Sequence, residues 1–193
     1  MFEYLKCFLS SSGNNYLGGQ DFSLRLFKHL LSVIEQQHDV RVDDAEDLQA
    51  LRDAAEQAKL RLTYSQSTII SVTLTSIKSK NAKFEYVITR EKFEALNSDL
   101  FKKVLEPLDK VLEFTEFSPA DIDEIVLVGG STRIPKVRQL IEEYFGKVPN
   151  TAIDPELAVV TGVSIQAGIL GGAWPLQVSA IEVETSVQKI HVH

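Results

Sequence analysis

Residues 125–135 of the chain read Ile-Val-Leu-Val-Gly-Gly-Ser-Thr-Arg-Ile-Pro. The apolar start is typical of a short strand covered on both faces, and Pro135 suits the first turn of a following helix. Gly129 and Gly130 allow a sharp backbone turn close to a ligand, because neither has a Cβ atom. The start of the helix would offer free N–H groups to an anion, and Arg133 adds a planar cation that can stack on a purine. The pattern also fits a tight turn without a ligand, and it is neither a Walker loop nor a dinucleotide fingerprint.

Apolar residues at helical spacing predict two helices before this turn. The first runs from Asp21, its expected N-cap, to about residue 37, and the second covers about residues 45–62. Alternating apolar and polar residues over 70–75 and 83–88 predict a β-hairpin, with its turn at residues 79–81.

Further helices are predicted in the remainder of the chain, one of them starting at residues 118–121 with Ser118 as its cap. A long helix would cover residues 89–108, with Thr89 as its cap and a kink at Pro107. Another would cover residues 135–145 and end at Gly146. The last, over residues 154–168, is rich in small residues, so we expect it to pack closely against its neighbours.

Composition and charge exclude some classes of function. The chain has 193 residues and a net charge of −7, from 20 basic and 27 acidic side chains. This balance argues against a nucleic-acid partner, because phosphate binding needs a clustered basic face. No apolar run reaches the roughly 18 residues of a membrane span, so none is expected. The single cysteine, Cys7, lies in a strand pattern over residues 2–8 and has no companions at metal-ligand spacing, so we expect no metal site.

Residues 125–135 resemble the adenosine-binding motif of the heat shock protein 70 family. Three further segments are similar to that family, at residues 17–22, 93–101 and 154–170. The resemblance implies an α/β fold, namely the second lobe of the actin-like ATPase architecture, which is ribonuclease-H-like. It also implies a division of the chain into a mixed-sheet core subdomain of residues 1–17 plus 97–172, an inserted α+β subdomain of residues 18–96, and a C-terminal tail of residues 173–193.

The resemblance further implies a binding site for ATP or ADP. Gly129, Gly130, Ser131 and Arg133 would line the adenine and its neighbouring phosphate, while the backbone of Gly19 would approach the phosphates.

A second group of implied site residues lies on the predicted helix over residues 45–62. Glu56, Lys59 and Thr63 lie at i, i+3 and i+7, so their side chains share one helix face. By residue type alone, Glu56 and Lys59 are typical of a solvated helix pair. In the family pattern the carboxylate and amine bind the ribose hydroxyls, and the hydroxyl at the position of Thr63 reaches the base. Glu156 stands where the family usually has an Asp near the adenosine.

Two residues depart from the family pattern. Leu60 stands where typical members carry an Arg that sandwiches the adenine opposite Arg133. The lost cationic face would remove about 0.5–2 kcal/mol of stacking. Gln20 replaces an acidic residue beside the phosphates, so nucleotide affinity is expected to be altered.

Hydrolysis needs a metal-bound triphosphate and a positioned water molecule. In the family these are provided by the first lobe and by an Asp-Leu-Gly-Gly-Gly-Thr loop, neither of which this chain contains. We therefore expect no catalytic residues and no measurable ATPase activity in this chain, and Mg²⁺ to accompany the nucleotide only in the intact protein. The expected partners are the nucleotide, the missing first lobe and a nucleotide-exchange factor or co-chaperone. The alternative function is a regulatory module that mainly docks such a factor. A sugar kinase or actin relative fits the residues 131–135 less well.

Residues 171–180, Gly-Gly-Ala-Trp-Pro-Leu-Gln-Val-Ser-Ala, are similar to the ending of a short, microsome-associated branch of the family. We therefore expect a natural short form in the lumen of the endoplasmic reticulum, with its signal peptide removed together with the missing first lobe. A chain trimmed at the interdomain linker and a cytoplasmic location are the alternatives. Residues 176–183 predict one more strand.

Overall fold

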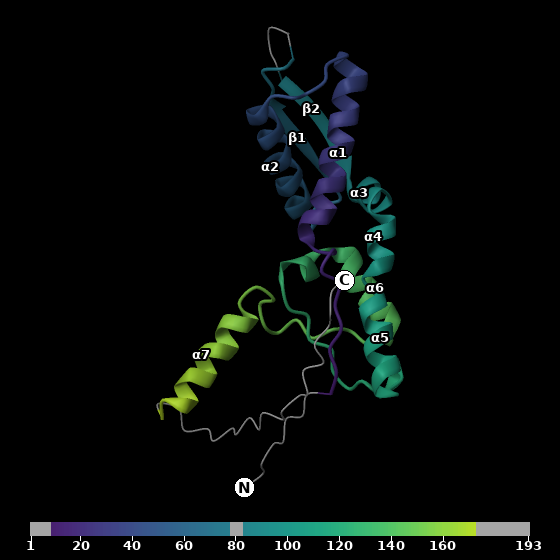
Figure 1. The fold of residues 1–193 in the computed structure, drawn as a ribbon, viewed down its shortest axis with the longest axis vertical. Helices are drawn as coiled ribbons and strands as arrows, with labels where there is room; N and C mark the ends of the chain where they lie inside the picture. The colour runs from purple at the N-terminus through teal and green to yellow at the C-terminus, as the bar shows by residue number, and fades with distance from the viewer. Residues whose placement is uncertain (1–8, 78–82, 173–193) are drawn as a thin grey trace, which may run out of the picture.

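The computed structural model describes residues 9–77 and 83–172 (Figure 1). Within these ranges the chain forms a mixed α/β structure with one small antiparallel sheet. The elements are α1 (Gly19–His38), α2 (Ala45–Leu62), β1 (Ser67–Thr73), β2 (Lys83–Thr89), α3 (Arg90–Leu96), α4 (Ser98–Lys103), α5 (Glu106–Thr115), the 3₁₀ turns η1 (Pro119–Asp121) and η2 (Gly130–Arg133), α6 (Pro135–Phe145) and α7 (Ala158–Leu170). The predicted strands over 2–8 and 176–183, Cys7 and the turn at 79–81 lie outside the described residues.

The helices α1 and α2 pack with the β1–β2 hairpin at one end of the molecule (Figure 1). The hairpin is antiparallel, with Ile70 opposite Tyr86, as its alternating pattern predicts. Alternate strand residues enter the core together with the apolar stripes of both helices. The fully buried members include Phe22, Leu26, Leu30, Ile34, Leu51, Ala55, Phe84 and Ile88. The two helices and the antiparallel pairing of the two strands are therefore confirmed, although β1 begins three residues and ends two residues earlier than predicted.

The start of α1 differs from the prediction. Gly18, not Asp21, is the N-cap, because its extended backbone precedes the first helical hydrogen bond, from Asp21 N to Gly18 O at 3.0 Å. The Asp21 carboxylate instead reaches back and accepts a hydrogen bond from Gly18 N at 2.7 Å. The acid stabilises the helix start from inside the first turn.

The long helix predicted over residues 89–108 is wrong, because the chain forms three shorter helices there, α3, α4 and α5. The first break is at Asn97, which is fully buried and donates through Nδ2 to Phe93 O at 2.9 Å. Pro107 lies in the first turn of α5, where its missing N–H is tolerated. Instead of the expected kink at Pro107, one helix ends at Lys103 and a new helix begins at Glu106. Thr89 does cap α3, by accepting from Lys92 N at 3.1 Å.

The predicted strand over residues 125–128 is also wrong in its extent. The described chain shows a single parallel bridge there, between Val126 and Asn150. Leu127 alone is buried, whereas Val126 and Val128 are exposed. Within residues 9–77 and 83–172 no strand pairs along the length of this segment, so it is not covered on both faces.

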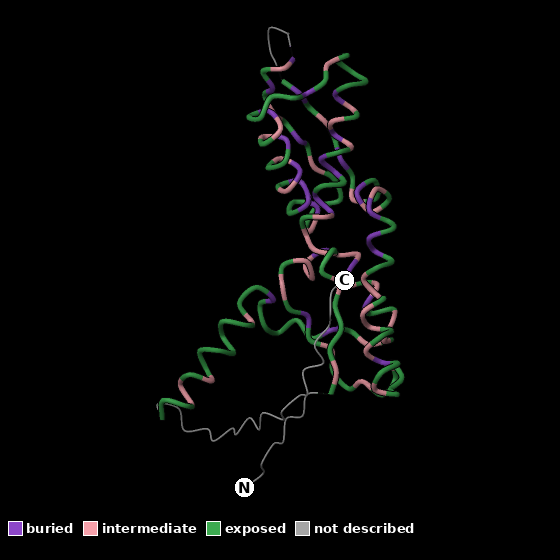
Figure 2. Tube along the Cα trace, viewed as in Figure 1, coloured by how far each residue is buried: buried purple, intermediate pink, exposed green. Residues whose placement is uncertain are grey.

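The last two helices differ in how they pack. Helix α6 begins at Pro135 and ends at Gly146 in a left-handed conformation with φ of 65°, as predicted. Helix α7 begins four residues later than predicted, and none of its residues is buried. Figure 2 shows it almost wholly exposed, so the expected close packing is wrong for the part of the chain that the structure describes. No helix among the described residues is both long and apolar enough to cross a bilayer.

The division into core, inserted subdomain and tail stays a prediction.

Candidate functional site

A cleft of about 290 Å³ lies where the start of α1, the second half of α2 and η2 meet. Its size is close to the lower end of the range for small-molecule sites, roughly 300–1,000 Å³. The lining residues come from segments far apart in the sequence. They are Gly19, Gln20, Glu56, Lys59, Leu60, Thr63, Gly130, Ser131, Arg133, Ile134 and Glu156. The fold thus brings together every predicted site residue except Gly129.

Lys59 and Glu56 form a fixed pair on one wall of the cleft. Lys59 is only 8% exposed, and its Nζ donates to Glu56 Oε2 at 2.8 Å and to Gly19 O at 2.9 Å. Ser23 Oγ donates to the same Glu56 oxygen at 2.5 Å. Burial pushes the pKa of Glu56 up, but the hydrogen bonds from Lys59 and Ser23 outweigh it and hold the pKa below its ordinary value. The carboxylate is therefore charged at neutral pH.

The glycines allow the walls of the cleft to approach each other. A Cβ atom on Gly19 would lie 3.2 Å from both Lys59 Nζ and Ser131 Oγ. A Cβ atom on Gly130 would lie 3.0 Å from Glu156 Oε1. Any side chain at these positions would displace groups that line the cleft, so the glycines leave room for a ligand next to the backbone.

Gly129 does not line the cleft, but as the N-cap of η2 it shapes the turn. Its φ of 93° and ψ of 151° are accessible essentially to glycine alone. Its N–H donates to Pro155 O at 2.7 Å, and its carbonyl accepts from Thr132 Oγ1 at 2.7 Å. The glycine turn is thus fastened to the segment that carries Glu156.

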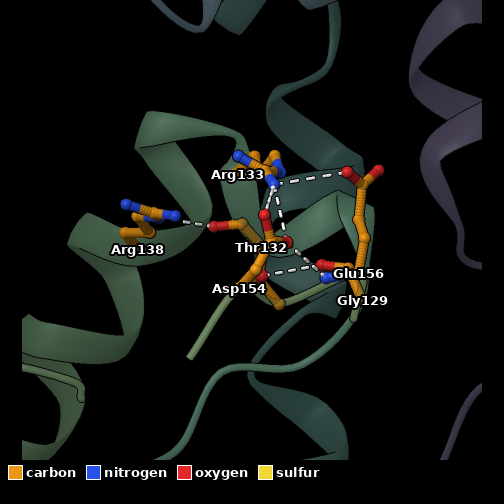
Figure 3. A network of polar contacts seen from close by, with 6 residues as sticks. All are labelled: Gly129, Thr132, Arg133, Arg138, Asp154 and Glu156. Atoms are coloured by element: carbon orange, nitrogen blue, oxygen red, sulfur yellow. Dashed lines mark hydrogen bonds and ion pairs between the residues drawn. The ribbon is translucent and has the colours of Figure 1, made fainter. Parts of the chain in front are cut away.

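Arg133 is held by two carboxylates from that segment (Figure 3). Its Nη2 donates to Asp154 Oδ1 and Oδ2 at 2.7 and 2.8 Å and lies 3.3 Å from Glu156 Oε2. The hydrogen bond to Asp154 raises the pKa of Arg133. The backbone N–H of Glu156, followed by Arg133, lowers the pKa of Asp154. A permanent cation therefore borders the cleft, restrained at one edge.

The two departures from the family pattern both line the cleft. Leu60 is 46% exposed and presents an apolar side chain to it, and Gln20 lies beside Gly19 at the start of α1. Thr63 is the C-cap of α2. Arg90 fixes that helix end by donating to Leu62 O at 2.9 Å and Thr63 O at 3.2 Å.

Sequence reasoning missed two residues that hold side chains of the site without lining the cleft, Ser23 and Asp154. Ser23 lies one helical turn after Gly19, a spacing that places both on one face of α1. The sequence of Asp154 and Pro155 predicts a helix start, because an Asp before a Pro is a common N-cap signal. Only the contacts with Glu56 and Arg133 show what these side chains do.

A larger groove of about 590 Å³ lies between α1 and α2, and it shares Gln20 and Glu56 with the cleft. It lacks Lys59 and the glycine turn, so we take the smaller cleft as the candidate site. Among the described residues, no group of three His, Cys, Asp or Glu side chains is close enough to hold a metal ion.

Comparison with known proteins shows the family of the chain. The family model described as "Hsp70 protein" matches residues 6–187, which is most of the chain. The chain belongs to the Hsp70 family. The resemblance predicted from residues 125–135 is therefore confirmed at the level of the family.

Individual relatives support the same assignment. The chain is similar to Heat shock 70 kDa protein 13 of Mus musculus, with 45% identity over 213 residues, covering 89% of this chain and 45% of the relative. The protein of that name from Homo sapiens is 44% identical with the same coverage. Chaperone protein DnaK of Thermotoga petrophila is 41% identical over 167 residues, covering 85% of this chain and 28% of the relative. The chain thus spans less than half the length of these relatives.

Proposed function

We propose that this chain is the adenosine-contacting second lobe of an Hsp70-type nucleotide-binding domain and that its cleft binds ATP and ADP. One observation carries the proposal. The residues that the family pattern assigns to nucleotide, from α1, α2, η2 and the segment before α7, line a single cleft, with the exception of Gly129, which is the N-cap of η2. A group of residues assembled from four segments is unlike a chance surface patch.

The chemistry of the cleft suits a nucleoside. Glu56 Oε2 accepts from Lys59 and Ser23, which leaves Oε1 to accept from a ribose hydroxyl. Lys59 Nζ has three protons and donates two of them within the protein, so a third can reach the other hydroxyl. Arg133 is held at one edge, so its flat face can stack on the adenine. Gly129 N–H donates to Pro155 O, so contact with the phosphates would fall to the following backbone N–H groups of the turn, those of Gly130 and Ser131.

Hydrolysis is assigned to the intact protein rather than to this chain. Mg²⁺ would neutralise the phosphate charge there, and in the family pattern its environment belongs to the first lobe. This chain would bind and orient the nucleoside without activating water. The chaperone activity of the whole protein and its location in the endoplasmic reticulum lumen remain proposals that rest on the resemblance.

The proposal is tested by titrating the 193-residue chain with ADP in an isothermal titration calorimeter. Lys59→Ala is expected to weaken binding about 10- to 100-fold, because a hydrogen bond to a charged group contributes about 1.5–3 kcal/mol. Arg61→Ala is the matched control, since Arg61 is an exposed cation two residues further along the same helix. Circular dichroism checks that both variants fold. Absence of ADP binding by the unmodified chain at millimolar concentration would refute the proposal.

A regulatory docking module is a second candidate, and one observation favours it. Ile69 and Val87 are direct cross-strand partners, and they are 58% and 61% exposed on the outer face of the hairpin. This apolar pair suits an exchange factor or co-chaperone. If docking dominates, Ile69→Ser would impair the intact protein, whereas Lys59→Ala and Arg133→Ala would leave its function unchanged.

A further inference from the structure

Asp154 contacts the site without lining it. The cleft is bordered by Arg133 and Glu156, whereas Asp154 is not among its lining residues. Both Asp154 oxygens accept from Arg133 Nη2, at 2.7 and 2.8 Å. Figure 3 shows Asp154 and Glu156 approaching the guanidinium from different sides. A nucleotide in the cleft would therefore meet Arg133 but not Asp154.

Hydrogen bonds also hold the Asp154 side chain and its segment in place. Its Oδ1 accepts from the backbone N–H of Glu156 at 2.9 Å. One residue away, Pro155 O accepts from Gly129 N at 2.7 Å, which ties the segment to the glycine turn. Asp154 is thus fixed relative to the same backbone that carries Arg133.

Few contacts hold the guanidinium of Arg133 in its orientation. In the part of the chain that the structure describes, its guanidinium contacts Asp154 and, at the longer distance of 3.3 Å, Glu156. Its Nε is buried and has no hydrogen-bond partner among those residues. An arginine side chain has several rotatable bonds, so an unrestrained guanidinium would occupy many orientations and lose stacking geometry.

We propose that Asp154 is a positioning residue for nucleotide recognition: it holds Nη2 of the Arg133 guanidinium with both carboxylate oxygens and so keeps the flat face in place to stack on the purine. This rests on the proposed nucleotide function of the cleft. The N–H groups of a guanidinium point outwards in its plane, so hydrogen bonds to them leave the stacking face free. Glu156 contacts the same nitrogen from the wall of the cleft, and Asp154 provides the shorter contacts.

A double-mutant cycle on the whole chain tests this, with ADP affinity as the readout. Asp154→Ala is expected to weaken ADP binding about 3- to 10-fold, a part of the roughly 2- to 30-fold that stacking on Arg133 contributes. In the Arg133→Ala background the same change is expected to have no effect, since there is no guanidinium left to hold. Asp154→Glu should restore much of the affinity. Asp123→Ala, at an exposed carboxylate outside the cleft, is the control.

The outcomes separate the inference from the function on which it rests. Equal weakening by Asp154→Ala in both backgrounds means a general structural role and overturns the inference, while ADP binding by the cleft stands. The same holds if Arg133→Ala weakens binding and Asp154→Ala does not. If the unmodified chain does not bind ADP, both the proposed function and the inference fall. A variant that does not fold is recognised by circular dichroism, and Asp154→Asn then takes its place in the cycle.

Discussion

Replacing Asp47 by Asn should destabilise the chain strongly, because this carboxylate joins α2 to the end of β1. Asp47 is 3% exposed. It accepts from Thr75 N at 2.9 Å, from Ser76 N at 2.8 Å and from Ser76 Oγ at 2.5 Å, with longer contacts to Thr75 Oγ1. Every partner is a donor, and two of them are backbone N–H groups that have this acid as their acceptor.

The amide introduced by Asp47→Asn would retain one acceptor oxygen and turn an NH₂ group towards the other backbone N–H. The change removes a hydrogen bond to a charged group, about 1.5–3 kcal/mol, and leaves a buried donor unpaired, about 1–3 kcal/mol. Rotation of the Ser76 hydroxyl recovers some of this, so we expect a loss of about 2–4 kcal/mol in the free energy of unfolding. For a chain of this size, that lowers Tm by about 5–15 °C.

Urea unfolding followed by circular dichroism measures the effect, with Asp53→Asn as the control. Asp53 lies on the same helix, is exposed and accepts a single hydrogen bond, from Gln49 at 2.9 Å. A loss below about 1 kcal/mol, or an equal loss in both variants, would refute the assigned role of the buried carboxylate.

The pH dependence of the same variant gives an independent check. Burial pushes the pKa of Asp47 up, but the hydrogen bonds from Ser76 and Thr75 outweigh it and lower the pKa. A lowered folded-state pKa means that the stabilisation is fully present above the unfolded value, about 3.9, and disappears as pH falls through the folded value. The difference in unfolding free energy between the original chain and Asp47→Asn should therefore be constant from about pH 5 to 8 and shrink below about pH 4.

Two further predictions concern the cleft. Gly129→Ala should destabilise the chain by about 1–3 kcal/mol in urea unfolding, because φ of 93° with ψ of 151° strains any residue with a Cβ. The effect would be purely conformational, since a Cβ atom there would meet no neighbouring group within 4 Å. Gly13→Ala, with equally open surroundings and no positive φ, is the control and should leave stability unchanged, and equal effects of the two variants would contradict the conformational explanation. Leu60→Arg should tighten ADP binding by about 0.5–2 kcal/mol, or about 2- to 30-fold, by adding a second cationic face opposite Arg133; calorimetry that shows no gain would count against stacking at this position.

Local patterns in the sequence predicted much of the structure of residues 19–88 and the members of the candidate site. Helical spacing placed α1 and α2, and the alternation over residues 70–75 and 83–88 placed the hairpin, because each pattern reflects one buried face. The family motif named Glu56, Lys59 and Arg133 as neighbours, and they line one cleft.

What local patterns missed depends on the surroundings of each segment. An apolar run such as residues 125–128 predicts burial, but its cover must come from other segments, and in the described chain only Leu127 is buried. Helix α7 is uncharged and small-residue-rich, yet whether such a helix packs depends on a neighbour that its own sequence does not specify.

The residue types and their spacing along the chain were sufficient to predict the family, because its motifs are runs of consecutive residues. They also predicted the hairpin and the glycine turn, because both depend on backbone conformation and on contacts between residues close in sequence. The helix breaks at Asn97 and at residues 104–105 and the roles of Ser23, Asp47 and Asp154 emerged only from the folded chain. Ser23, Asp47 and Asp154 each act through a partner more than 20 residues away, and hydrogen bonds of that kind exist only after the helices and loops have been brought together.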